Sequence, residues 1–191
     1  MALSLGGCGD SAQIRELTPD SVILAFGDSL TSGRGAAANA AYPDVLSRLL
    51  GNRVINAGRA GELSAAGLKR LPSELEAHRP ELVILCHGGN DMLQKQDPAA
   101  IARNLDAMIR LAKESGADVI LLGVPEPGIF LGTAFFYEEL AEQHQIPYDG
   151  ETIKEILSDG SLKSDYVHPN AQGYRRLAES VASLIGERQV T

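Results

Sequence analysis

The sequence has little cysteine, no long apolar run and a deficit of basic residues, and each scarcity narrows what the chain can be. Two cysteines, Cys8 and Cys86, are too few for a disulfide framework, and no Cys/His spacing matches a zinc site. No stretch approaches the ~20 apolar residues that a membrane-spanning helix requires. The 17 Lys and Arg stand against 25 Asp and Glu, a net charge of −8. This balance argues against nucleic acid as a partner, because such binding depends on basic side chains that neutralise phosphates.

The rest of the composition is that of a soluble globular protein. Hydrophobic residues make up 44% and charged residues 22% of the 191 positions, which separates the chain from disordered sequences. This length suits one domain with a sizeable core and is short for two. No internal repeat, low-complexity tract or interdomain linker interrupts it, so we expect a single domain over residues 17–191.

A short motif stands near the N-terminus. Leu5-Gly6-Gly7-Cys8 resembles a bacterial lipobox, in which a signal peptide is cleaved before a cysteine that then carries lipid. The apolar stretch before Cys8 is short and lacks a basic segment, so we expect residues 1–16 to be a truncated signal remnant followed by a polar tether. A lipid on Cys8 of the native precursor would place the protein outside the bacterial cytoplasm, in the periplasm or held at a membrane. The alternative is an unstructured leader with an incidental cysteine.

From Ser21 onward, short apolar runs alternate with segments of helical periodicity. The runs are rich in Val, Ile and Leu, which is typical of strands covered on both faces. They span residues 21–27, 53–57, 81–86 and 118–124. Helices are expected around residues 42–50, 65–78, 101–112 and 174–184. Alternating strands and helices predict a parallel sheet with helices on both faces, an α/β/α sandwich of three layers.

Ligand sites in such sheets form beyond the carboxyl ends of the strands, where several polar residues of this sequence fall. Ser29 follows the first predicted strand, and a serine hydroxyl becomes a good nucleophile only when a base takes its proton. His168 is the candidate base. Asp165, three residues earlier, can accept a hydrogen bond from one ring nitrogen and leave the other free for Ser29. Taken singly, such a serine is more often a cap or turn residue, and such a histidine a surface residue.

Acyl transfer also needs donors for the negative charge that develops on the carbonyl oxygen. Three candidates follow the predicted strands: the N–H of Ser29, the N–H of Gly61 and the side-chain amide of Asn90. Gly61 has no Cβ, so a substrate could approach its N–H closely. The alternative is that the glycines near these positions only shape the turns between strands and helices.

Four blocks of the sequence together resemble the GDSL or SGNH hydrolase superfamily. They are Gly27–Gly33, Asn56–Glu62, Gly88–Asp91 and Asp165–His168. The resemblance runs from about residue 22 to 185 and is strongest to small bacterial esterases of the thioesterase I, lysophospholipase I and arylesterase type. It implies a five-stranded, mostly parallel sheet in flavodoxin-like order, and no cofactor. One departure is Glu62-Leu63, where relatives often have Asp-Thr or Glu-Thr.

Residue by residue, the resemblance implies a catalytic triad and an oxyanion hole. Ser29 would be the nucleophile, with Asp165 and His168 as the other two triad members. Gly61 and Asn90 would join the N–H of Ser29 in holding the oxyanion.

We therefore expect a serine ester hydrolase that forms an acyl-serine intermediate and takes small or single-chain acyl esters, with thioesters and lysophospholipids possible by resemblance. We expect the substrate pocket to be lined by Asp28, Leu30, Phe130 and Val167. Phe130 belongs to an aromatic stretch with Phe135 and Phe136, and the alternative for these rings is a place in the core.

Other functions stay open from the sequence. One is a carbohydrate O-acetylesterase outside the cytoplasm; another is a non-catalytic lipid- or carbohydrate-binding module, which a complete set of catalytic groups argues against. A dinucleotide fingerprint at residues 33–38 stands too far from the strand end to bind a cofactor. His87 is a lone histidine, which we expect to line the site or pack beneath it rather than bind a metal.

Overall fold

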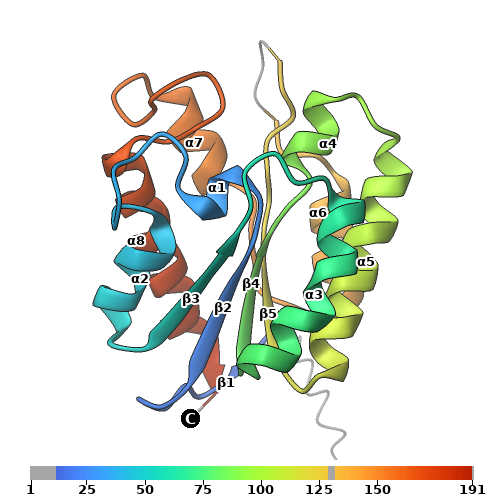
Figure 1. Ribbon diagram of the computed structural model, residues 1–191, viewed down its shortest axis with the longest axis vertical. Helices are drawn as coiled ribbons and strands as arrows, with labels where there is room; N and C mark the ends of the chain where they lie inside the picture. Colours follow the sequence, from blue (N-terminus) through green and yellow to red (C-terminus); the bar gives the residue numbers. More distant parts are fainter. Residues whose placement is uncertain (1–11, 129–131, 191) are drawn as a thin grey trace, which may run out of the picture.

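The computed structural model describes residues 12–128 and 132–190 and contains a central sheet between two layers of helices (Figure 1). Its five parallel strands are β2 (Val22–Gly27), β3 (Arg53–Gly58), β4 (Leu82–Cys86), β5 (Asp118–Leu122) and β6 (Tyr148–Asp149). Their order is β3-β2-β4-β5-β6, so the first strand of the sheet lies between the second and the third. The predicted three-layer sandwich with a flavodoxin-like order is confirmed.

Helices cover both faces of this sheet (Figure 1). One face carries α2 (Tyr42–Leu50), α7 (Thr152–Ser158) and α8 (Ala171–Arg188). The other carries α3 (Ser64–His78), α5 (Pro98–Glu114) and α6 (Phe136–His144). Two short helices, α1 (Ser29–Ser32) and α4 (Gly89–Leu93), begin where β2 and β4 end. In the described part of the chain, no helix is both long enough and apolar enough to cross a membrane.

The helix boundaries follow from capping residues in the sequence. Pro43 and Pro98 lie in the first turns of α2 and α5, where proline removes no needed hydrogen bond. Asn170 caps α8, since its side-chain oxygen accepts hydrogen bonds from the N–H groups of Gln172 and Gly173 at 2.9 and 3.1 Å. This cap fixes the chain direction just after the segment that contains His168.

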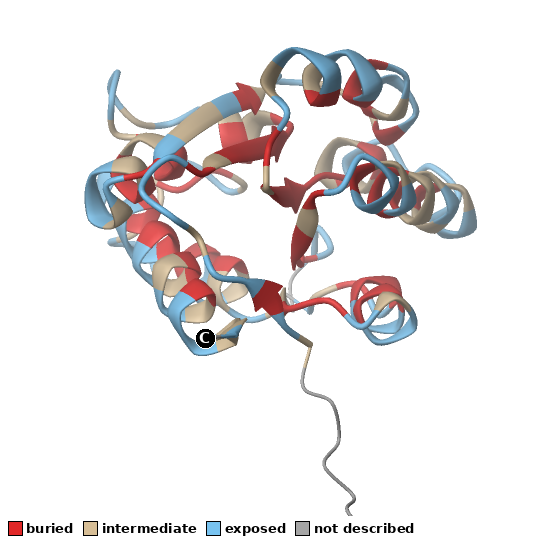
Figure 2. Ribbon diagram, turned by 90° about the horizontal axis from the view of Figure 1, so that it is seen from below, coloured by how far each residue is buried: buried red, intermediate tan, exposed pale blue. Residues whose placement is uncertain are grey.

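The core lies on both sides of the sheet. All five residues of β4 are buried, which explains why this strand reads as a continuous apolar run. Figure 2 shows buried residues along the strands and on the helix faces that turn toward them, with exposed residues on the outer faces. Packing on both faces therefore fixes the ends of the strands, and the residues that directly follow the strands begin from these fixed positions.

Residues 12–16 belong to the fold rather than to the tether that we expected there. Ile14 and Arg15 form β1, which pairs in parallel with β7 (Gln189–Val190) in a separate two-stranded sheet. Ile14 is only 2% exposed, and Arg15 binds the carboxylate of Asp118 at 2.9 Å. Burial of one apolar side chain and an ion pair hold this segment against the amino end of β5.

Candidate active site

Ser29 lies at the carboxyl end of β2, as the first residue of α1. Asp28 caps this helix, because its Oδ1 accepts a hydrogen bond from the Leu30 N–H at 3.1 Å. The Asp28 side chain is buried, and this burial raises its pKa above the usual range. The cap fixes the first turn of α1 and with it the place of the Ser29 hydroxyl.

The structure brings Ser29, His168 and Asp165 together, although the serine and the histidine are 139 positions apart in the sequence. The Nε2 of His168 lies 3.1 Å from the Ser29 Oγ, and its Nδ1 lies 2.8 Å from the Asp165 Oδ2. We assign a proton to Nδ1, which donates a hydrogen bond to the carboxylate, so that Nε2 is free to accept the hydroxyl proton. His168 is buried, whereas the side chain of Asp165 is half exposed.

A tight turn holds His168 in this orientation. The Oδ1 of Asp165 accepts hydrogen bonds from the backbone N–H groups of Val167 and His168, both at 2.9 Å. The Ser164 N–H donates to the His168 carbonyl at 2.9 Å, which closes the loop on itself. Although partial desolvation opposes it, the hydrogen bonds from Val167 and His168 lower the pKa of Asp165. The carboxylate is thus ionised at neutral pH and faces the imidazole.

Asn90 and Gly61 lie on two neighbouring segments at the same edge of the sheet. Asn90, in α4, lines the same pocket as Ser29, and its Nδ2 donates to the Glu62 carbonyl at 3.1 Å. Gly61 is exposed and has a backbone φ of +81°, a conformation that residues with a Cβ rarely adopt. The hydrogen bond from Asn90 therefore ties α4 to the loop that contains Gly61.

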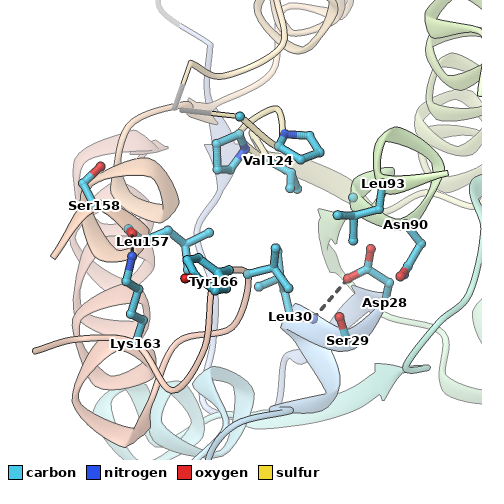
Figure 3. Close-up of a pocket in the computed structure, with 15 residues that line it drawn as sticks. Asp28, Ser29, Leu30, Asn90, Leu93, Val124, Leu157, Ser158, Lys163 and Tyr166 are labelled. Carbon is cyan, nitrogen blue, oxygen red and sulfur yellow. Dashed lines mark hydrogen bonds between the residues drawn. The ribbon is translucent and has the colours of Figure 1, made fainter. Parts of the chain in front are cut away.

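A pocket of about 560 Å³ opens beside Ser29 (Figure 3). Asp28, Ser29 and Asn90 lie at one side of it, and Leu157, Ser158 and Lys163 lie at the other. The lining also includes Leu30, Gly89, Leu93, Val124, Pro125, Pro127, Gly128, Tyr166 and Val167. Its walls are mostly apolar, which suits an acyl chain or an aromatic group.

Only some of the residues predicted for the pocket line it in the structure. Asp28, Leu30 and Val167 line the pocket, whereas Phe130 lies outside the described residues, as does Cys8. Phe136 is 3% exposed and packs in the core at the start of α6. Phe135 is 65% exposed and is not part of the pocket wall. Of these two rings, one anchors a helix and neither forms the pocket.

Several residues of the site were not expected from the sequence. Lys163, Tyr166 and Leu157 come from α7 and the loop after it, and we predicted no helix there, although the apolar spacing of Ile153, Ile156 and Leu157 is helical. His87, which we expected to line the site or pack beneath it, does not line the pocket; it is fully buried and lies 3.4 Å from the Glu62 carboxylate. Within residues 12–128 and 132–190, no group of three His, Cys, Asp or Glu side chains could hold a metal ion.

Comparison with known proteins shows which family the chain belongs to. The GDSL-like Lipase/Acylhydrolase family matches residues 25–176. The chain belongs to this family. It is 32% identical to the esterase TesA of Pseudomonas aeruginosa, over 94% of this chain and 95% of TesA. It is 30% identical to the thioesterase 1/protease 1/lysophospholipase L1 of Escherichia coli K12, over 85% of this chain and 82% of that protein.

A solved structure extends the likeness to three dimensions. A crystal structure of TesA superposes with a TM-score of 0.79 and 28% identity, over 87% of this chain and 99% of that one. Family membership and this fold confirm the prediction of a GDSL/SGNH-type serine esterase.

Proposed function

We propose that Ser29, His168 and Asp165 are the catalytic triad of this esterase, and that the Ser29 N–H, the Gly61 N–H and the Asn90 amide form its oxyanion hole. The observation that supports this proposal most strongly is the 3.1 Å contact between Ser29 Oγ and His168 Nε2, with Asp165 on the other ring nitrogen. A nucleophile that contacts a base, itself oriented by a third group, is the arrangement that acyl transfer requires.

In the first half of the reaction, Ser29 Oγ forms a bond to the ester carbonyl carbon while His168 Nε2 takes its proton. The carbonyl oxygen becomes an oxyanion, which the three donors stabilise. The negative Asp165 stabilises the imidazolium that has formed. The bond from carbon to the leaving oxygen or sulfur then breaks, and His168 returns the proton to the leaving group.

The second half regenerates the enzyme. A water molecule attacks the acyl-Ser29 carbonyl while His168 takes a proton from it, and the same donors hold the second oxyanion. The bond between the acyl carbon and Ser29 Oγ breaks, His168 gives the proton back to Ser29, and the free acid leaves. One histidine thus acts as base and acid in turn, which is why its orientation by Asp165 matters in both halves.

The pocket supports a substrate with a single acyl chain or a small apolar group. Leu30, Leu93 and Val124 offer apolar surface, and a volume of about 560 Å³ is within the usual range for small-molecule sites. Among the described residues of the lining, apolar side chains outnumber polar ones, which suits an acyl chain better than a sugar ring with its hydroxyl groups. We therefore favour acyl esters, with thioesters and lysophospholipids as further candidates, over acetylated carbohydrates.

The test is turnover of p-nitrophenyl esters of increasing acyl length by the parent enzyme and by Ser29→Ala. We expect kcat/KM to rise from the acetate until the chain fills the pocket, and Ser29→Ala to lose about 10⁴-fold or more of kcat. Acyl-CoA and acetylated glycans, assayed in parallel, distinguish the substrate classes. Turnover that survives in folded Ser29→Ala would remove this serine from its role.

We also propose that a lipid on Cys8 holds the esterase at a membrane outside the cytoplasm. The support is the motif Leu5-Gly6-Gly7-Cys8, since that cysteine is where a lipobox would be modified. The complete gene, expressed in bacteria fed an alkyne fatty acid, should yield labelled protein in the membrane fraction. Cys8→Ser should yield unlabelled protein, and equal labelling of both would overturn the proposal.

A further inference from the structure

A buried ion pair lies behind the loop that contains Gly61, and the reaction steps above make no use of it. The side chains of Glu62 and Arg70 are only 9% and 6% exposed. The Arg70 Nε donates to the Glu62 Oε1 at 2.9 Å, and the Nη2 donates to the Oε2 at 2.6 Å. Removing two charges from water is unfavourable, so such a pair is weak evidence for stability and invites another explanation.

Arg70 itself is held from three directions. Its Nη2 also donates to the Ala57 carbonyl at 3.0 Å, at the end of β3. Its Nη1 donates to the Glu74 carboxylate at 3.1 Å, one turn further along α3. The guanidinium carbon lies 4.2 Å from the centre of the Phe26 ring, in β2. The cation is thus fixed to the rigid part of the sheet and to α3.

His87 adds a third member to this cluster. Its Nδ1 accepts a hydrogen bond from the Gly88 N–H at 3.0 Å, so in the neutral ring the proton is on Nε2. That Nε2 faces the Glu62 Oε2 at 3.4 Å. A Cβ on Gly67 of α3 would lie 2.4 Å from Nε2, so the helix has a glycine where the ring needs the space. His87 directly precedes the Gly88–Asp91 block, and so it connects Glu62 to the segment that contains Asn90.

Glu62 also contacts that segment through its backbone. Its carbonyl accepts the hydrogen bond from the Asn90 Nδ2 at 3.1 Å, and Gly61 is the residue before it. A Cβ placed on Gly61 would have no atom of a described residue within 4 Å, apart from its chain neighbours. Side-chain packing there therefore does not fix the position of the loop. The loop is held instead by polar contacts: the side chain of Glu62 binds Arg70, and the N–H of Ser64 donates to the Asp91 carboxylate at 2.8 Å.

We propose that Glu62, Arg70 and His87 are positioning residues that hold the Gly61 N–H and the Asn90 amide in place for the oxyanion. This inference rests on the proposed roles of Gly61 and Asn90. Donors that are displaced by about 1 Å can cost about 10²-fold in rate, so a fixed loop has direct catalytic value. Although burial opposes it, the hydrogen bonds from His87 and Arg70 lower the pKa of Glu62 to about 2. The Glu62 carboxylate therefore stays ionised throughout the pH range of an esterase assay.

The test begins with Glu62→Gln, which keeps the shape and an oxygen for Arg70 but removes the charge. We expect kcat for p-nitrophenyl butyrate to fall about 10- to 100-fold with KM within about 2-fold, because the oxyanion forms after binding. The rate of inactivation by diethyl p-nitrophenyl phosphate should fall by a similar factor, since its phosphoryl oxygen uses the same donors. Asp118→Asn is the matched control, because it removes a carboxylate from an arginine pair at the opposite end of the sheet.

A second pair of variants separates positioning from stability. His87→Gln keeps an N–H donor that can reach Glu62, whereas His87→Leu removes it. We expect the glutamine variant to retain more kcat than the leucine variant at equal Tm. Equal kcat in these two variants, or a kcat of folded Glu62→Gln within 2-fold of the parent, would overturn the proposal. Failure of the proposed function would differ, because the parent enzyme would then not be phosphorylated on Ser29.

Discussion

Two arginine–carboxylate pairs lie at opposite ends of the same sheet, and their surroundings differ sharply. The pair of Glu62 and Arg70 lies at the carboxyl end, with side chains 9% and 6% exposed. The pair of Asp118 and Arg15 lies at the amino end, with side chains 27% and 49% exposed. Water and salt screen the second pair, so it contributes little beyond holding β1 in place. The first pair is desolvated, which makes its loss costly and its geometry fixed.

The comparison extends to the two ends of the sheet as a whole. At the carboxyl end, Ser29 and Asn90, which follow β2 and β4, line one pocket, and His168 from the loop before α8 contacts Ser29 at 3.1 Å. At the amino end, a buried isoleucine and a two-stranded sheet join the terminal segments of the described chain. We therefore expect substitutions of Ser29, Asn90 and Asp165 to change rate more than stability, and substitutions at the amino end to do the reverse. Loss of the buried Glu62 charge should lower both.

The largest effect is expected for Asp165→Asn. The asparagine can donate to the imidazole and favours the wrong tautomer of His168, so kcat should fall by about 10⁴-fold. Tm should change little, because the Asp165 side chain is half exposed. Steady-state kinetics and a thermal melt on the same preparation check both statements. A loss of less than about 10-fold would show that Asp165 does not orient His168.

A smaller loss is expected for Asn90→Ala, which removes one of the donors proposed for the oxyanion. Single donors of this kind contribute about 10²- to 10³-fold in kcat, so the variant should fall in that range with KM nearly unchanged. Asn90→Ser supplies a shorter donor and serves as the comparison. A change confined to KM would place Asn90 in substrate binding instead.

How much of this arrangement the sequence predicts depends on the range of the contacts. The strands and the helix at 42–50 were predicted well, because apolar periodicity is a local property and α2 spans those residues. The resemblance of the four sequence blocks to the GDSL/SGNH family predicted that Ser29 and His168 would lie close together. The pair of Glu62 and Arg70 was not expected, because a loop residue and a helix residue eight positions apart have no periodic relation. Likewise β6, with two residues, is too short to show a pattern.

At the amino end, Ile14→Ala should lower stability and spare activity. The side chain is 2% exposed, and truncation of a buried isoleucine costs about 2–5 kcal/mol. Urea unfolding measures this loss, and we expect kcat/KM to remain within about 2-fold. Loss of activity in the folded variant would mean that β1 acts on the distant site, against the separation of the two ends.

The smallest expected effect is a difference between the two ion pairs in how they make the free energy of unfolding depend on pH. Burial opposes both shifts. Hydrogen bonds from His87 and Arg70 lower the pKa of Glu62 to about 2, and hydrogen bonds from Arg15 lower the pKa of Asp118. A carboxylate whose pKa is lowered by folding stabilises the protein above its unfolded pKa, and this contribution is lost as the pH falls toward the folded pKa.

The free energy of unfolding should therefore decline as the pH falls from about 5 toward 2. Glu62→Gln should flatten this decline more than Asp118→Asn, whose exposed pair is expected to contribute less than about 1 kcal/mol. Urea titrations at several pH values measure the slopes. A steeper dependence on Asp118 than on Glu62 would reverse the ranking of the two pairs.

The most direct test of the central claim is mass spectrometry after treatment with diethyl p-nitrophenyl phosphate. An activated Ser29 should displace one equivalent of p-nitrophenolate, and a single diethylphosphoryl group should map to the peptide that contains Ser29. Asp165→Asn should be labelled far more slowly, because its His168 is not correctly oriented to take the hydroxyl proton. An active parent enzyme that is labelled on another residue, or not at all, would contradict the account.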